Sequence, residues 1–303
     1  MCLAGRIAWA RLTPGSMAPL RTTPITLLGR RHAPLWASLA GTPEGMPSGR
    51  AQKALDRLRE QGALFFEELA EATGLLRPQM EEALAELVGL GLVTSDSFGG
   101  LRALLVPSDR RKPFSGATRR RRIISFGMED AGRWSLIRAP AREGGAVEHI
   151  ARTLLHRYGV VFWRLLAREA PWLPPWRDLL RVYRRMEARG DIRGGRFVAG
   201  FSGEQYALPD AVGMLRETRR RPHSGEYVSL SGADPLNLAG ILTPGARLAA
   251  LTGNRLLFLD GMPVASLAGG DVQFLVSLDA AAQWHARKLL LRSASPAALA
   301  DLA

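Results

Sequence analysis

Cysteine, lysine and histidine are scarce in this 303-residue chain, and each shortage excludes a class of site. The single cysteine, Cys2, rules out an intramolecular disulfide, a zinc finger and a CxxC redox motif. The three lysines, Lys53, Lys112 and Lys288, follow Gln, Arg and Arg, so none belongs to the Gly-Lys pair that a phosphate-binding P-loop requires. We therefore expect this chain neither to bind nor to hydrolyse ATP.

Long apolar runs and metal-ligand clusters are missing as well. No stretch reaches about 18 uninterrupted apolar residues, so no membrane partner is expected. His149 and His156 lie two turns apart on one predicted helix, but no third ligand accompanies them, and we predict no metal site. The segment "GFSGE" around Ser202 lacks the spacing of a nucleophile elbow and is expected to form a turn.

Positive charge is in excess, with 41 basic against 28 acidic residues and a net charge of +13. Such a balance favours a polyanionic partner, because phosphates attract the chain and released counterions drive association. The alternative is an arginine-rich background composition without function. The near absence of cysteine fits a reducing cytoplasm.

The first 42 residues contain five arginines and no acidic residue. This composition is typical of a transit peptide, and equally of a chain whose start has been truncated. An internal repeat favours truncation.

The repeat relates residues 51–105 to residues 147–208. Leu58, Gly62 and Leu69 match Leu155, Gly159 and Leu166 at one constant offset. In each copy a helix with apolar residues at helical spacing ends at glycine, a short helix follows (66–72 or 162–169), and a longer third helix ends at a second glycine. Alternating, glycine-interrupted strands then follow. Three helices closed by a β-hairpin predict a winged helix-turn-helix domain.

Other segments complete the predicted α+β fold. Gly5 resembles the helix-exit glycines Gly91 and Gly190, so residues 1–34 are expected to be the wing of a third unit. After Pro209, short strands between turns suggest a small antiparallel barrel or curled sheet, with a hairpin at Asp260-Gly261, an edge strand at Pro263 and a closing helix at 278–292. The predicted domains are a wing remnant (1–43), an acidic winged helix (44–110), a basic linker and strand (111–142), a basic winged helix (143–212) and a β-rich, barrel-like domain with a closing helix (213–303).

The two complete units differ in charge. Residues 51–107 carry five basic and nine acidic residues, a net charge of −4, and the third helix bears Glu81, Glu82 and Glu86, which would repel phosphates. Residues 143–208 carry eleven arginines against seven acids, a net charge of +4. The run of arginines at 119–122 between the units is either an exposed phosphate contact or solvated charge.

On the third helix of the basic unit, two faces are separated by helical periodicity. The apolar positions predict a buried stripe of Leu179, Val182, Tyr183 and Met186. The arginines recur at i, i+4, i+7 and i+8 on another face, and further arginines follow on the wing. The candidate phosphate-contacting residues are Arg177, Arg181, Arg184, Arg185, Arg193 and Arg196. The alternative is a solvated polar face.

A longer string adds a resemblance. "RYGVVFWRLLAREAPWLPPWRDLLRVYRRMEARGDIRGGRFVAGFSGEQYALP" resembles the C-terminal region of the bacterial large helicase-related (Lhr) family of superfamily 2 helicases, and "SGADPLNLAGILTPG" and "GNRLLFLDGMPVA" resemble its β-rich segment. The resemblance implies ATP-dependent 3′–5′ unwinding of DNA and RNA–DNA hybrids, linked to DNA repair, with ATP and Mg in upstream motor domains. Those motor motifs are absent here, so unwinding is not carried over. We expect this chain to hold no cofactor. The expected partners are DNA, RNA–DNA hybrids and the upstream motor domains, and a homo-oligomer is a further possibility that the sequence leaves open.

The same resemblance leaves open an enzymatic alternative to a binding module, namely a base-excision domain. The Lhr C-terminal array is similar to winged-helix DNA glycosylases of the alkylpurine type, whose Gln-x-Gln motif does not occur here. Glycosidic cleavage needs a polar group that positions water at a flipped base. Asp234 in "GADPLN" is the candidate, against the simpler interpretation of a turn-forming Asp before Pro.

Overall fold

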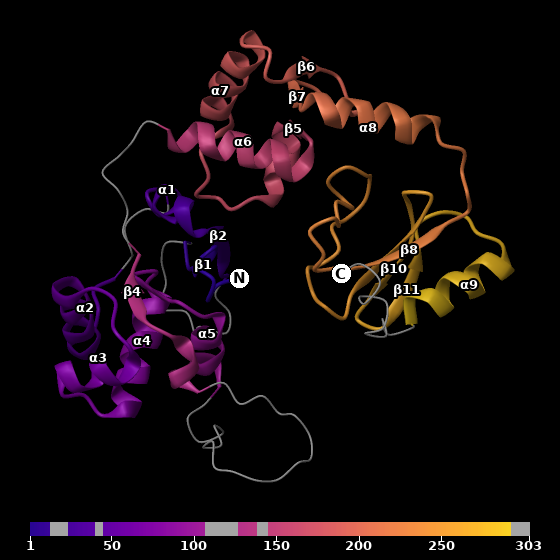
Figure 1. Ribbon diagram of the computed structural model, residues 1–303. Helices are drawn as coiled ribbons and strands as arrows, with labels where there is room; N and C mark the ends of the chain where they lie inside the picture. Colours follow the sequence, from indigo (N-terminus) through magenta and orange to yellow (C-terminus); the bar gives the residue numbers. More distant parts are fainter. Residues whose placement is uncertain (13–23, 40–44, 107–126, 138–144, 292–303) are drawn as a thin grey trace. The chain divides into compact units, whose positions relative to one another are not determined.

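A computed structural model describes residues 1–12, 24–39, 45–106, 127–137 and 145–291 (Figure 1). The predicted contact at arginines 119–122 lies outside these ranges. The chain divides into two compact units, Met1–Arg152 with Ala170–Val182, and Thr153–Glu169 with Tyr183–Ala303. In the described ranges, no helix has the length and apolar character to cross a membrane.

Three helices of the first unit enclose its core: α2 (Gly49–Gln61), α3 (Phe66–Thr73) and α4 (Arg77–Gly89). Ala54, Leu55 and Leu58 are buried in this core, as their helical spacing predicts. The start of α2 is held by α4, because the Ser48 N–H and hydroxyl each donate to Glu86, both at 2.6 Å. Before these helices lie a short 3₁₀ helix, η2 (Arg30–His32), and α1 (Ala33–Ala37).

Two small sheets belong to the same unit. Strand β1 (Ile7–Ala10) pairs antiparallel with β2 (Thr26–Gly29), and β3 (Val93–Ser95) pairs with β4 (Trp134–Leu136). Between β3 and β4 the chain forms α5 (Phe98–Leu105) and the 3₁₀ helix η4 (Met128–Ala131). Of the glycine-interrupted strands predicted after Gly91, β3 is therefore present, while residues 98–105 are helical and the prediction of strands there is wrong. Gly100 allows the start of α5 to pack closely, since a Cβ there would lie 2.4 Å from the Ser95 hydroxyl oxygen.

One helix-exit turn occurs three times in the chain. At Gly91 the N–H donates to Val88, and the next N–H, of Leu92, donates five residues back to Leu87. The same pair of hydrogen bonds forms around Gly190 and around Gly5, and all three glycines have φ between 70° and 81°. This is the Schellman geometry, in which a left-handed residue without a Cβ ends the helix. A strand follows each turn: β1, β3 and, in the second unit, β6 (Arg193–Gly195).

The segment around β6 has the order of elements of a winged helix. It contains α6 (Ala146–Tyr158), β5 (Val160–Phe162), the 3₁₀ helix η5 (Trp163–Arg168), α7 (Trp176–Ala188), β6 and β7 (Gln205–Ala207). The three strands form one antiparallel sheet in the order β5-β7-β6. Helix α8 (Pro209–Arg220) follows, a helix that the strand-like interpretation of this segment missed. Proline suits the first turn of a helix, where its missing N–H has no partner to lose.

The last elements form a four-stranded sheet with one helix on it (Figure 1). Strands β8 (Tyr227–Ser231), β9 (Arg255–Leu259), β10 (Met262–Ala268) and β11 (Asp271–Phe274) form an antiparallel meander in the order β11-β10-β9-β8. Helix α9 (Ala280–Leu291) packs Ala286 and Leu290 against Leu257 and Ala265. Of the two predicted forms, a barrel or a curled sheet, the barrel is wrong for the described residues, because β8 and β11 are the two edges and do not pair.

Pro263 lies on an inner strand, so the prediction of an edge strand is wrong. Strand β10 pairs with both β9 and β11. Its pairing with β11 begins only at Ala265, after a register shift next to Pro263. The proline is tolerated because no β11 residue requires an N–H at that point. Whether the first unit is a second winged helix in tandem stays a prediction.

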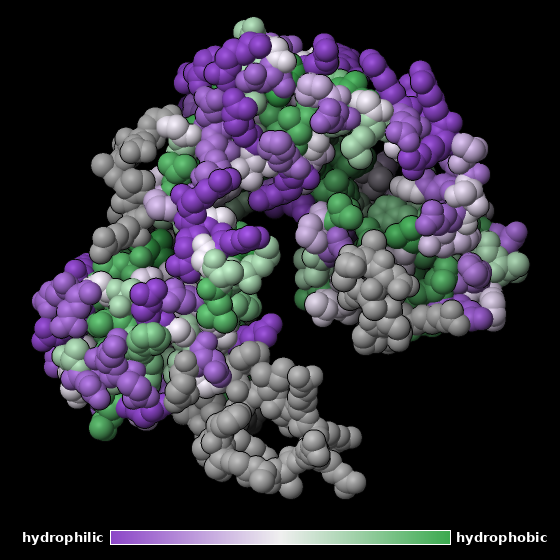
Figure 2. Space-filling model, in the orientation of Figure 1, coloured by the Kyte–Doolittle hydropathy of each residue, from purple (hydrophilic) through white to green (hydrophobic). Residues whose placement is uncertain are grey.

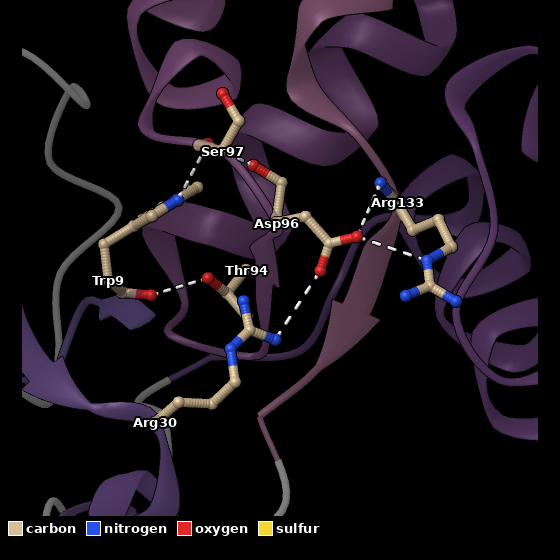
Figure 3. A network of polar contacts seen from close by, with 7 residues as sticks. Trp9, Arg30, Thr94, Asp96, Ser97 and Arg133 are labelled. Carbon is tan, nitrogen blue, oxygen red and sulfur yellow. Dashed lines mark hydrogen bonds and ion pairs between the residues drawn. The ribbon is translucent and has the colours of Figure 1, made fainter. Parts of the chain in front are cut away.

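A network of polar contacts connects the two sheets of the first unit (Figure 3). The buried Trp9 donates its indole N–H to the carbonyl of Ser97 at 3.1 Å, and its carbonyl accepts from the Thr94 hydroxyl at 2.6 Å. Asp96 accepts from the backbone N–H and side-chain Nε of Arg133 at 3.3 and 3.2 Å and pairs with Arg30 at 3.5 Å. A single carboxylate therefore joins β3 to residues next to β4 and β2.

We predict that Asp96→Ala destabilises the first unit by about 1–2 kcal/mol, because one backbone N–H and two guanidinium groups lose their acceptor. The measurement is thermal unfolding followed by circular dichroism. Asp56→Ala is the matched control, since Asp56 pairs with Arg59 on the exposed face of α2 and should change stability by less than about 0.5 kcal/mol. Equal transition temperatures for Asp96→Ala and the parent would contradict the role of the network.

Candidate nucleic-acid interface

Helix α7 has one buried and one exposed face. Leu179, Val182, Tyr183 and Met186 are each at most 3% exposed, which confirms the predicted buried stripe. The Tyr183 ring stacks on that of Tyr206 of β7, with centroids 5.3 Å apart. Burial raises the pKa of Tyr183 well above its usual range, so this ring stays neutral. The rotation of α7 about its axis is fixed by this packing, and the arginines are left outside.

The exposed face of α7 carries the four predicted helix arginines. The side chains of Arg177, Arg181 and Arg184 are 81%, 74% and 60% exposed, and Arg185 is exposed too. Asp178 lies 3.7 Å from Arg177 and 3.4 Å from Arg181, an exposed arrangement that contributes little to stability. The guanidinium groups of this face are therefore available to an anionic partner at small energetic cost.

The wing adds two exposed arginines and one acid. Arg193 begins β6, and Arg196 follows its last residue. Glu204, next to β7, accepts from Arg184 at 3.0 and 3.2 Å and thereby joins the wing to α7. The hydrogen bond with Glu204 raises the pKa of the Arg184 guanidinium. In the described ranges no ion pair is found for Arg185, Arg193 or Arg196.

Two side chains that sequence reasoning missed hold the wing in place. Gln205 is fully buried; its Oε1 accepts from the N–H groups of Phe197 and Val198 at 2.9 and 2.8 Å, and its amide donates to the carbonyl of Val198. Glu187 at the end of α7 accepts from the N–H of Gly194 at 3.0 Å. A Cβ on Gly194 would lie 2.3 Å from that carboxylate oxygen, so a larger residue here would displace the Glu187 side chain from the wing.

Figure 2 shows hydrophilic side chains over the exposed sides of α7 and α8. Helix α8 has no buried residue and bears Arg216, Arg219 and Arg220. The third helix of the first unit, α4, bears acids in place of arginines: Glu82 lies 3.4 Å from Arg50 of α2, and Glu86 accepts from Ser48. The geometry of the two units thus agrees with the charge difference found in the sequence.

Asp234 lies in the loop between β8 and β9. Its Oδ1 accepts from the N–H of Leu236 at 2.8 Å, the geometry of an Asx turn. Arg168 of η5 holds the loop from outside by donating to the carbonyls of Asp234, at 3.0 Å, and of Asn237. The turn-forming role predicted for Asp234 is therefore present.

Comparison with known proteins places the winged helix. Residues 140–227 match the family model described as "Large helicase-related protein, winged-helix domain". By this match the chain is similar to the large helicase-related (Lhr) family over its winged helix. It is 31% identical over 183 residues to the "Lhr helicase/uracil glycosylase" of Escherichia coli (strain K12), covering 54% of this chain and 12% of that protein.

A second relative gives the same result. The chain is 31% identical over 208 residues to the "Lhr helicase/ probable uracil glycosylase" of Mycolicibacterium smegmatis (strain ATCC 700084 / mc(2)155), covering 61% of this chain and 14% of that protein. The resemblance found in the sequence is confirmed. The chain corresponds to only these small shares of the relatives' length.

We predict that Gly194→Ala weakens the attachment of the wing, because the new methyl group displaces Glu187 and removes its hydrogen bond. The expected loss is about 1 kcal/mol in the free energy of unfolding, measured by urea titration. Gly213→Ala in α8 is the control; a Cβ there meets open space, and alanine should stabilise the helix by about 0.5–1 kcal/mol. A loss for Gly194→Ala that persists when Glu187 is also replaced by alanine would argue against this explanation.

Proposed function

We propose that this chain is a nucleic-acid-binding module of an Lhr-type helicase, with no motor activity of its own. In this proposal it holds DNA, or an RNA–DNA hybrid, for upstream motor domains that unwind in the 3′–5′ direction during DNA repair in the bacterial cytoplasm. The observation that supports it most directly is the exposed arginine face of α7 beside the arginine-bearing wing.

Phosphate contact explains this surface better than stability does. Exposed arginines contribute little to folding, and few acids neutralise them here. Arginine is suited to phosphate recognition because its planar guanidinium donates several hydrogen bonds at once. Positioning on the sugar-phosphate backbone needs no base-specific side chain, and α7 contains no Asn or Gln that could pair with a base edge. We therefore expect weak sequence preference and strong dependence on salt.

The test is a double substitution, Arg181→Ala with Arg185→Ala, in the full 303-residue chain. Nucleic-acid affinity should fall, and the slope of log K against log salt should decrease by about one to two contacts, each worth roughly 0.7–0.9. Thermal unfolding should be nearly unchanged, since both side chains are exposed. Fluorescence anisotropy over a salt series measures both quantities.

Arg57→Ala with Arg59→Ala is the charge-matched control. It also removes two positive charges, but from α2 of the first unit, where both arginines pair with acids of the same helix. It should leave the salt slope unchanged. If the folded Arg181/Arg185 variant binds nucleic acid with the same affinity as the parent, the arginine face is only a solvated surface and the proposal is wrong.

A second candidate function is uracil excision, which the printed names of both relatives favour. Such a reaction breaks the bond between uracil and C1′ of the sugar, and a water molecule supplies the hydroxyl group. The part proposed for Asp234 is to orient that water or to stabilise positive charge on the sugar through its carboxylate. Its loop is held by Arg168 and by the buried Asn237, which donates to the carbonyl of Gly232 at 3.1 Å. A fixed loop is what a catalytic carboxylate requires.

Asp234→Asn separates turn formation from catalysis, because an asparagine oxygen can still accept from the N–H of Leu236 while the negative charge is lost. If the proposal holds, the parent chain releases uracil from a uracil-containing single strand, and the variant is slower by at least about a hundredfold at equal affinity. The measurement is alkali-induced cleavage at the abasic site. Equal rates for parent and variant, or no release by the parent, would exclude Asp234 as the catalytic group of this chain.

A further inference from the structure

Trp163, the first residue of η5, is 66% exposed within an otherwise apolar segment. The constant offset that aligns Gly62 with Gly159 places Trp163 opposite Phe66, which is only 2% exposed. The aromatic side chain at this position is therefore exposed in one copy of the repeat and buried in the other. Since single exposed apolar side chains are common, the location of Trp163 has to decide its meaning.

The core of the second unit does not need this ring. Phe162, one residue earlier, is 1% exposed, and its ring packs against Phe201 of the wing with centroids 4.8 Å apart. Leu165 fills the next core position at 2% exposure. Where the first unit has the α-helix α3, the second has a strand followed by a 3₁₀ helix. This change of local structure buries Phe162 and Leu165 and places Trp163 outside.

Trp163 lies at the same end of the sheet as the wing arginine Arg196. Strands β5 and β6 both run antiparallel to β7, on its two sides, and Phe162 and Gly195 are both paired with Gln205. Neighbouring strands lie about 4.8 Å apart, so these two residues are about 10 Å apart. Trp163 and Arg196 each follow directly, and Arg164 is exposed beside Trp163. Trp163, Arg164 and Arg196, one aromatic and two basic residues, thus all follow the strands at one end of the sheet.

We propose that Trp163 stacks on an unpaired base of a single-stranded segment, while Arg164 and Arg196 contact its phosphates. This inference rests on the proposed binding function and specifies its substrate as a strand with exposed bases. Non-specific single-strand binding combines these two elements, a basic surface along the backbone and an aromatic ring for a base. In an intact duplex both faces of an inner base are already covered by its neighbours, so the indole gains a stacking partner only where a strand is unpaired.

The experiment compares Trp163→Ala with the parent on three DNA probes: a single strand, a blunt duplex and the same duplex with a single-stranded tail. We expect Trp163→Ala to weaken binding to the single strand and the tailed duplex about tenfold and to change blunt-duplex binding less than about twofold. Trp163→Phe should keep most of the affinity. The salt slope should stay constant for Trp163→Ala, because no charge is lost, and decrease by about 0.7–0.9 for Arg196→Ala.

Trp284→Ala is the matched control, since Trp284 on α9 is 64% exposed and already lies 4.9 Å from the ammonium group of Lys288. It should leave all three affinities unchanged. Single-strand binding by folded Trp163→Ala that stays within twofold of the parent overturns the inference, and a protein partner then becomes the explanation for this ring. An equal loss on all three probes also overturns it. If the parent binds none of the probes, the proposed nucleic-acid-binding function has failed. If the Arg181/Arg185 variant loses blunt-duplex binding while Trp163→Ala keeps it, the binding function of the arginine face is supported independently of Trp163.

Discussion

The winged helix of residues 146–207 depends on how the chain leaves α7. Gly190, with φ of +81°, adopts a left-handed conformation that lets the N–H of Asp191 donate back to Met186. The chain reverses within a single turn, so β6 begins three residues later and the wing lies against the helix that it follows. The contacts of Glu187 with Gly194 and of Arg184 with Glu204 both require this reversal. The arginines of helix and wing become neighbours because of backbone geometry, and their own charges would oppose that arrangement.

The charge on the third helix of each repeat copy, α4 and α7, follows from how that helix is anchored. In the first unit, Glu86 holds the start of α2 and Glu67 pairs with Arg77, so acids on the surface also support the fold. In the second unit the corresponding helix is anchored by the stacked rings of Tyr183 and Tyr206 and by aliphatic contacts. Its outer face is then free to carry arginine without loss of stability. Duplicated folds can diverge in this way, since only the buried face is constrained by packing.

The sequence predicted the features that depend on local periodicity and chain reversal. The stripe of Leu179, Val182, Tyr183 and Met186 follows from helical spacing alone, and the three exit glycines follow from the requirement for a left-handed residue. Contacts between distant residues were not predictable: the Arg184–Glu204 pair joins positions 20 residues apart, and nothing in "GFSGE" indicates a partner. The sheet of β8 to β11 and its closing helix were predicted from local patterns, but whether the sheet closes depends on pairing between its first and last strands, which no local pattern encodes. The exposure of Trp163 was hidden because the repeat aligns it with a buried phenylalanine.

The short helix η5 connects the two candidate chemistries of the second unit. Its first residue is the exposed Trp163, and its last, Arg168, donates to the carbonyls that frame the Asp234 turn. Arg247 strengthens the same junction by donating to the carbonyl of Ala167 at 3.3 Å. Separate substitutions at Trp163 and Asp234 therefore test the two proposals independently, since stacking is proposed for the indole and excision for the carboxylate, while Arg168 holds the loop that carries the carboxylate.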